Sequence, residues 1–258
     1  MIKNNWFIPA FVLVITLITI AFNSLANILP LNGLNTGQIS DRYPVLFVPA
    51  GYVFSIWGLI YIVLVAYSVY QLLPAQRSNT RLQRIAPLYM VSGLANMVWL
   101  ALWHFEQITL SLAAMLVLLA SLIAIYLVLR GGNKKVSRSE SLFIRLPFSI
   151  YLGWVSVATI ANASTVLYNL GWNGGGINPV IWTVSLMIIG GILAGTALLT
   201  RRDVAYSLVF VWAFTGIAVK HADVQPIMLA GYIISAFLLV AAMLTLARRQ
   251  STLKAATV

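Results

Sequence analysis

Residues 108–130 read ITLSLAAMLVLLASLIAIYLVLR, and no charged side chain interrupts this stretch before Arg130. A helix needs about 20 mostly apolar residues to cross the hydrocarbon core of a bilayer. The stretch also lacks the alternation of apolar and polar side chains that marks the strands of a membrane barrel. Because only helices and closed barrels satisfy their backbone groups in lipid, these residues predict a membrane-spanning helix.

Seven further stretches have the same apolar character, and none of them carries an Asp, Glu, Lys or Arg at its centre. We therefore predict an all-α integral membrane protein with about eight transmembrane helices. The predicted spans are 6–29, 50–73, 85–103, 108–130, 143–169, 178–200, 204–220 and 224–247.

The composition of the whole chain agrees with this fold class. Of its 258 residues, 61% are hydrophobic and 8% are charged, and the mean hydropathy is +0.93. Soluble domains average about 25% charged residues, so the composition excludes a soluble enzyme, a disordered chain and a fibrous protein. The chain has no cysteine, so neither disulfides nor thiolate metal sites are expected.

The net charge of +11 arises from 16 Lys and Arg against 5 Asp and Glu. With eight spans, only Arg42 and Lys220 fall on one side of the membrane, and the other 14 basic residues fall on the opposite side. Cytoplasmic loops collect Lys and Arg, so this split predicts that both termini are cytoplasmic. The charge thus indicates orientation and gives no reason to expect nucleic acid as a partner. The residues on the basic side are Lys3, Arg77, Arg81, Arg84, Arg130, Lys134, Lys135, Arg138, Arg145, Arg201, Arg202, Arg248, Arg249 and Lys254.

Two features near the N-terminus leave alternatives open. Lys3, the apolar run and the small-residue pattern at residues 24–26 also fit a cleavable signal peptide, although the run is longer than is usual for one. The connection at residues 30–49 is long for a compact bundle. Such a loop is often functional, and a flexible surface connection is the equal alternative.

The ionisable residues form no recognisable catalytic or metal site. The carboxylates lie in loops or at span ends, which argues against a proton-coupled transporter. His104 and Glu106 are too few to hold a metal, and a structural role for His104 is the favoured interpretation. There is no phosphate-binding glycine motif and no zinc-protease motif. We expect neither a metal nor catalytic residues.

Tryptophan and asparagine supply the unusual polar content of the spans. Three pairs are spaced by three, four or eight residues, which places the members of each pair on one helix face. Such residues around one cavity suit a flat, apolar ligand with a few polar edges. Packing between helices is the alternative. The pairs are Asn96 and Trp99, Trp154 and Asn162, and Trp57 and Tyr61; Trp212 is also expected to lie deep, whereas Trp6, Trp103, Trp172 and Trp182 are interpreted as interfacial belt residues.

Three motifs occur in order on the second, third and fifth spans. Residues 47–57 read FVPAGYVFSIW, residues 96–99 read NMVW, and residues 151–162 read YLGWVSVATIAN. Together they resemble the TspO/MBR family, the tryptophan-rich sensory proteins related to the translocator protein. The chain departs from the family's pattern at Ala50 and Tyr52 and is one residue short before Trp57, which on a helix rotates the following residues by about 100°.

The resemblance implies a five-helix unit at residues 1–170, followed by a three-helix extension at 171–258, and a cavity under the first long loop. Family members bind porphyrins and other tetrapyrroles, cholesterol-like lipids and aromatic ligands. The resemblance implies a porphyrin- or haem-type ligand, but it implies no obligatory cofactor. Carried over by position, the residues lining the pocket would be Trp57, Asn96, Trp99, Trp154 and Ala158, and those shaping it would be Pro49, Tyr52, Phe54, Tyr61 and Asn162.

The resemblance also implies a function and a setting. We expect a sensor, or a protein of tetrapyrrole handling, in a bacterial plasma (inner) membrane. Its partners would be the lipid bilayer, a small hydrophobic ligand and, by analogy, a second copy in a homodimer. The alternatives are a permease for a small apolar or amphipathic solute and an enzyme of light-dependent porphyrin breakdown. A cavity of several hundred Å³ between the second, third and fifth spans would support ligand binding.

Overall fold

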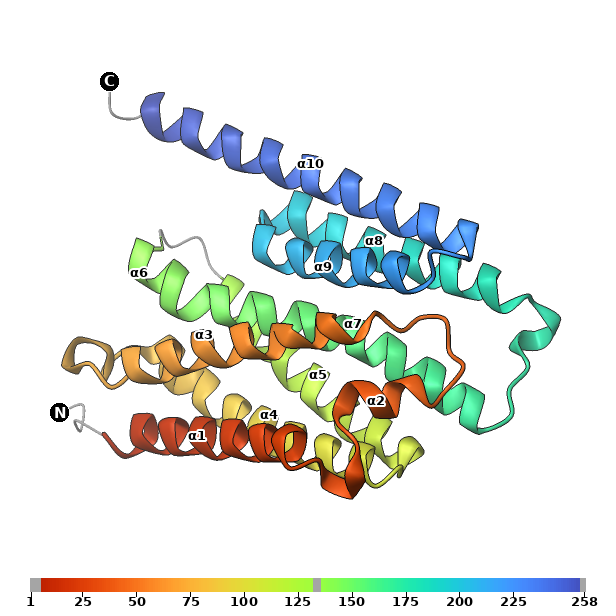
Figure 1. Ribbon diagram of the computed structural model, residues 1–258. Helices are drawn as coiled ribbons and strands as arrows, with labels where there is room; N and C mark the ends of the chain where they lie inside the picture. Colours follow the sequence, from red (N-terminus) through yellow and green to blue (C-terminus); the bar gives the residue numbers. More distant parts are fainter. Residues whose placement is uncertain (1–5, 132–135, 256–258) are drawn as a thin grey trace.

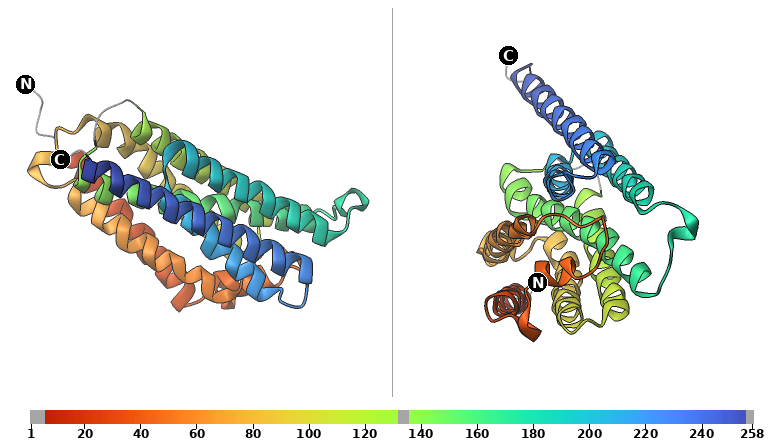
Figure 2. Two further views of the ribbon diagram at one scale, coloured as in Figure 1. Left: turned by 90° about the horizontal axis from the view of Figure 1, so that it is seen from above. Right: turned by 45° about the vertical axis from the view of Figure 1, so that its right-hand side comes forward.

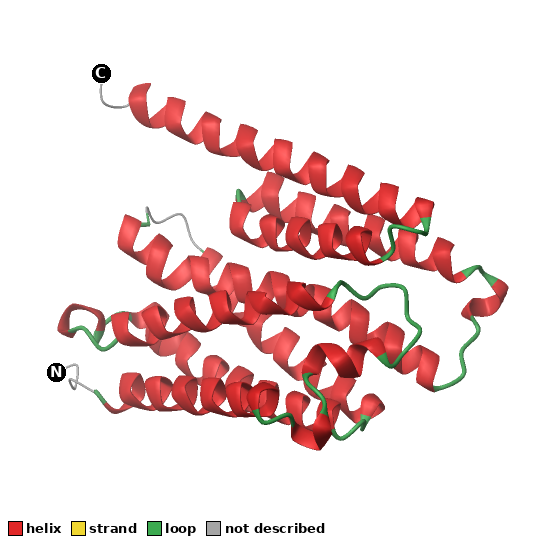
Figure 3. Ribbon diagram, in the orientation of Figure 1, coloured by secondary structure: helices red, strands yellow, loops and turns green. Residues whose placement is uncertain are grey.

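The computed structural model describes residues 6–131 and 136–255, and every regular element in these two ranges is a helix (Figure 3). The basic residues Lys3, Lys134 and Lys135, which contribute to the predicted orientation, lie outside the described residues. Seven of the described helices are long and apolar enough to cross a membrane, in agreement with the predicted fold class. The protein is an integral multi-pass membrane protein.

The long helices are α1 (Phe7–Ile28), α3 (Ile56–Tyr70), α4 (Thr80–His104), α5 (Ile108–Arg130), α7 (Leu146–Asn169), α8 (Pro179–Arg201), α9 (Val204–Lys220) and α10 (Gln225–Ala255). The short elements are α2 (Thr36–Asp41), α6 (Arg138–Glu140), the 3₁₀ turns η1 (Leu31–Gly33), η2 (Gly51–Ser55), η3 (Pro74–Gln76) and η5 (Gly174–Gly176), and the π-helical turn η4 (Ser141–Arg145).

Helix α3 has 15 residues but continues from η2, and together they form an apolar span of 20 residues. Helix α9 is the predicted span that falls short of this length. Its 17 residues extend about 26 Å, whereas the hydrocarbon core of a bilayer is about 30 Å thick. The helix packs between α7, α8 and α10, and Phe210, Phe214 and Ile217 are fully buried. Because α9 is largely covered by protein, its length is not set by contact with lipid.

The helices lie in two groups, the first five long helices on one side and the last three on the other (Figure 1). Helices α1, α3, α4, α5 and α7 form the first bundle, in which α4 packs on α5 and α5 on α7. The last three helices form a second layer that rests on α7 through α9 (Figure 2). The beginning of α1 and the end of α10 lie at the same end of the molecule as the α8–α9 turn. We call this the basic end.

Glycines allow the second layer to approach the first. A Cβ atom on Gly153 of α7 would lie 3.0 Å from Val209 Cβ and 3.1 Å from the carbonyl oxygen of Tyr206, both on α9. Within the second layer, Gly190 of α8 faces Phe214 of α9 in the same way. The close contact of α7 with α9 therefore depends on the absence of a side chain at residue 153.

The long connection between α1 and α3 is packed against the bundle. We call residues 30–55 the capping segment. Its helix α2 begins with a capping box, in which Asn35 Oδ1 accepts from the backbone N–H of Gln38 and Gln38 Oε1 accepts from that of Asn35. Further along, the N–H of Ala50 donates to the carbonyl of Gly216 on α9 at 3.1 Å. The segment thus bridges the first bundle and the second layer.

Buried polar side chains join the first helices to one another. The Thr16 hydroxyl lies 2.6 Å from Ser68 Oγ and 2.7 Å from Tyr89 Oη, which links α1 to α3 and α4. Two helical turns further along α1, Asn23 Nδ2 donates to Asn96 Oδ1 at 2.7 Å. Hydrogen bonds of this kind hold membrane helices together where the hydrophobic effect cannot.

Candidate functional site

An aromatic cluster lies where α3, α4 and α7 meet beneath the capping segment. Trp57 is at its centre, with ring centroids 5.6 to 6.3 Å from those of four neighbours. Rings at such distances attract each other by about 0.5–1.5 kcal/mol a pair beyond their burial. The aromatic cluster consists of Phe54, Trp57, Tyr61, Trp99, Trp103, Tyr151 and Trp154.

The turn η2 brings Trp57 into the cluster. A 3₁₀ helix advances about 120° a residue and an α-helix about 100°. The five residues of η2 therefore turn the chain about 100° further than five α-helical residues would. This extra rotation sets the direction in which α3 presents Trp57.

A small cavity of about 40 Å³ lies within the cluster and under the capping segment. Seven of the ten predicted site residues line it, although they come from separate parts of the sequence. Its volume is far below the several hundred Å³ typical of a ligand pocket. The predicted residues along the cavity are Pro49, Phe54, Trp57, Trp99, Trp154, Ala158 and Asn162, and Thr36, Ser40, Trp103, Val157, Ala161 and Thr165 complete the lining.

Two indole N–H groups beside the cavity lack hydrogen-bond acceptors. Trp99 and Trp154 are buried, and among the described residues neither Nε1 atom has a partner. Leaving a buried donor unsatisfied costs about 1–3 kcal/mol. By contrast, Trp103 Nε1 donates to the carbonyl of Thr36 at 3.3 Å, which ties α4 to the capping segment. The two free donors mark the place where an acceptor from a ligand would be stabilised.

Three predicted site residues lie away from the cavity. Asn96 is fully buried, and its Oδ1 accepts from Asn23, so it contributes to helix packing. Tyr61 stacks on Trp57, with ring centroids 5.6 Å apart, but does not line the cavity. Tyr52 is 49% exposed and meets the ring of Trp212 edge-on at 5.5 Å.

Two further tryptophans make contacts that the sequence interpretation does not include. Trp103, interpreted as an interfacial belt residue, lies in the last turn of α4, is buried in the protein, stacks on Trp99 and lines the cavity. Its spacing of four residues from Trp99 was a usable signal, because both residues then share a helix face. Trp212, expected to lie deep, is at the middle of α9; it is 39% exposed and donates through Nε1 to the carbonyl of Val53 at 3.0 Å.

The site offers little chemistry beyond hydrogen bonding and stacking. Neither a carboxylate nor a histidine nor a lysine lines the small cavity within the described ranges. His104 is buried with its ring nitrogens near Thr36 Oγ1 and the carbonyl of Leu31, and Glu106 pairs with Arg42. No cluster of three His, Cys, Asp or Glu that could hold a metal occurs among the described residues.

Comparison with known proteins identifies the family. The family model of TSPO-like proteins matches residues 9–244, a range that includes α8, α9 and most of α10. Neither a curated protein nor a solved structure matches the chain. The division of the chain at residue 170 stays a prediction. Since the match covers most of the 258 residues, the chain belongs to the family of TSPO-like proteins.

Proposed function

We propose that this TSPO-like membrane protein binds a flat apolar ligand, such as a porphyrin or another tetrapyrrole, at the aromatic cluster, and that it serves as a sensor or in tetrapyrrole handling. The observation that carries the proposal is the pair of buried indole N–H groups of Trp99 and Trp154. They lack acceptors although they stand among stacked rings and beside a cavity.

The chemistry of the cluster suits such a ligand. A tetrapyrrole has a wide π face, which aromatic side chains contact favourably in stacked or edge-on geometry. Its carboxylate or carbonyl edge supplies the acceptors that Trp99 and Trp154 lack. A hydrogen bond to a charged acceptor contributes about 1.5–3 kcal/mol, so the lower limit for each indole N–H is about a tenfold change in affinity.

Binding requires the cavity to widen, because ligand pockets have volumes of about 300–1,000 Å³ and this one has about 40 Å³. The capping segment is the part of the wall that can move without separating α3, α4 and α7. Its contacts with α9 include two hydrogen bonds, from Ala50 to Gly216 and from Trp212 to Val53, and the Lys220–Asp41 ion pair. Rings of the segment also meet rings of α9, Tyr52 with Trp212 and Phe47 with Phe214. Displacing the segment would thus transmit ligand binding to the second layer.

We further propose that the basic end faces the cytoplasm of a bacterial cell, with both termini there. Arg81, Arg130 and Arg201 represent the charge at this end, whereas Arg42 and Lys220 lie at the other. This distribution follows the rule that Lys and Arg collect in cytoplasmic loops.

The test is the affinity for protoporphyrin IX of purified protein in lipid nanodiscs, followed by the absorbance of the porphyrin. Trp99→Phe and Trp154→Phe keep a ring and remove the N–H donor. Each should weaken binding by about tenfold, since about 1.4 kcal/mol is lost. Trp6→Phe is the matched control, because Trp6 is 51% exposed and far along the chain from the cluster. Equal affinities for all four proteins would overturn the proposal.

One observation favours a permease as the alternative function. A second cavity of about 1070 Å³ lies on the other side of α7, lined by Ser156 and Thr159. A permease would use it as part of a path for an amphipathic solute. Uptake of protoporphyrin into proteoliposomes separates the two functions, and we expect no uptake that depends on the protein. Protein-dependent uptake that Ala163→Trp abolishes would favour the permease, because Ala163 lines this second cavity.

A further inference from the structure

A long groove separates α8 from the first bundle. Helix α8 packs against α9 and α10 (Figure 2). The cavity of about 1070 Å³ is lined by residues of both α8 and α7. We call this space the α7–α8 groove. Its wall includes Leu119 and Ile123 of α5, and Tyr206 of α9 lies at its basic end. None of the sequence motifs predicts this space, because its walls are separate in the sequence.

The groove has the length and lining of a site for acyl chains. Its lining extends from Trp172 and Trp182 at one end to Thr200 and Arg201 at the other. Helix α8 has 23 residues and is about 34 Å long, so the groove extends across the hydrocarbon thickness of a bilayer. Small residues such as Ala163 on α7 leave room between the helices.

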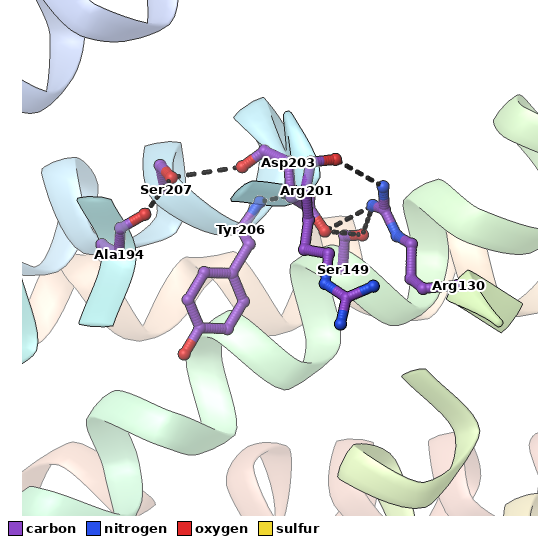
Figure 4. Close-up of polar contacts among 7 residues, drawn as sticks. All are labelled: Arg130, Ser149, Ala194, Arg201, Asp203, Tyr206 and Ser207. Atoms are coloured by element: carbon purple, nitrogen blue, oxygen red, sulfur yellow. Dashed lines mark hydrogen bonds and ion pairs between the residues drawn. The ribbon is translucent and has the colours of Figure 1, made fainter. Parts of the chain in front are cut away.

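A cation without a counter-charge stands at the basic end of the groove. Arg201 lines the groove, is exposed, and forms no ion pair with any described residue. The nearby carboxylate of Asp203 is already used. It accepts from Arg130 Nη2 at 2.5 Å and from Ser149 Oγ at 2.7 Å, and Figure 4 shows the Arg201 side chain extending beside Tyr206 without a contact to its guanidinium.

The other carboxylates of the chain are also committed or distant. Asp41 pairs with Lys220, Glu106 with Arg42 and Glu140 with Arg81. The fifth, Asp223, follows α9 at the end opposite to Arg201. Arg201 therefore has its guanidinium available for an anion from outside the chain, and guanidinium groups bind phosphate through two parallel hydrogen bonds.

We propose that one anionic phospholipid occupies the α7–α8 groove, with its phosphate at Arg201 and its acyl chains between α7 and α8. The apolar groove accounts for the chains, and the uncompensated charge accounts for the preference for an anionic headgroup. The lipid fills the space between the first bundle and the second layer. It occupies the face of α7 that carries Ser156 and Ala163, opposite to the aromatic cluster, and is independent of the proposed porphyrin site.

Native mass spectrometry of the purified full chain tests this proposal with equimolar phosphatidylglycerol and phosphatidylcholine. The wild-type protein should retain one phosphatidylglycerol at least tenfold more than phosphatidylcholine. Arg201→Gln should reduce this preference to less than twofold. Arg202→Gln is the matched control, because Arg202 is also exposed but does not line the groove, and it should keep the wild-type preference.

Two further arms identify the occupant. Ala163→Trp and, separately, Ala197→Phe fill the groove and should remove both lipids while the protein stays monodisperse. Excess glycerol 3-phosphate should not displace the lipid, because it lacks acyl chains. The proposal is overturned if Arg201→Gln keeps the preference for phosphatidylglycerol or if Arg202→Gln loses it equally. It is also overturned if glycerol 3-phosphate displaces the lipid, or if Ala163→Trp and Ala197→Phe still retain lipid. Dimers in place of lipid adducts would show that a second copy covers the groove, and would also overturn it.

Discussion

Replacing Asp203 by Asn should detach the second layer from the first bundle at the basic end. The Asp203 side chain is 2% exposed and the Arg130 side chain is 15% exposed, and the two atoms in contact are 2.5 Å apart. Removing one partner of a fully buried ion pair costs about 3–5 kcal/mol, because the other charge stays buried without compensation. Since Arg130 retains some contact with solvent, we expect the lower limit, about 3 kcal/mol. Asn can still accept from the N–H of Tyr206, so the N-cap of α9 is preserved.

The assay is the free energy of unfolding in mixed micelles, measured with SDS as denaturant. Asp41→Asn is the matched control, because Asp41 is 50% exposed in its pair with Lys220 and its loss should cost less than 1 kcal/mol. Adding Arg130→Gln to Asp203→Asn should restore part of the loss, since it removes the uncompensated charge. The reasoning is refuted if Asp203→Asn destabilises the protein no more than Asp41→Asn does.

Two further predictions concern packing and pH. Gly153→Val places a side chain against the carbonyl of Tyr206 on α9 and should destabilise the protein by about 1–3 kcal/mol in the same assay. The control Gly58→Ala should not destabilise the protein, because there is open space around Gly58. Equal effects of the two substitutions would contradict the role given to Gly153. Burial, and then the charge of Lys220, lower the pKa of His221 below its usual value of 6.5. His221 therefore binds its proton more readily in the unfolded chain than in the folded protein. The contribution of neutral His221 to the free energy of unfolding should be complete above about pH 6.5 and should decrease as the pH falls below that value. His221→Asn should reduce this fall in the thermal unfolding midpoint between pH 7.5 and 5.5, and an unchanged fall would count against the pKa shift.

The apolar helices could be predicted closely from the sequence, because the bilayer imposes both length and composition. The spans predicted at 108–130 and 204–220 have the bounds of α5 and α9. The third span was predicted from residue 85, but α4 begins at Thr80, with the Asn79 side chain accepting from the N–H of Arg81. Basic residues at a span end were interpreted as a loop, although a helix can continue beyond the lipid.

The candidate site could be predicted in part. The motifs located most of the residues around the small cavity, because positions on one helix face follow from spacing alone. Spacing could not show that Tyr52 turns toward Trp212, since this contact joins the capping segment to a helix 160 residues later in the chain. Spacing within one helix could not predict the α7–α8 groove either, because the groove depends on the distance between α7 and α8.

The most direct measurement of the central claim is a map of tryptophan oxidation after illumination of protoporphyrin bound to the protein. An illuminated porphyrin forms reactive oxygen that oxidises the nearest indoles, and peptide mass spectrometry locates them. We expect the four tryptophans that line the small cavity to be oxidised first, namely Trp57, Trp99, Trp103 and Trp154. Earlier oxidation of Trp172 and Trp182, which line the α7–α8 groove, or equal oxidation of all eight tryptophans, would contradict binding at the aromatic cluster.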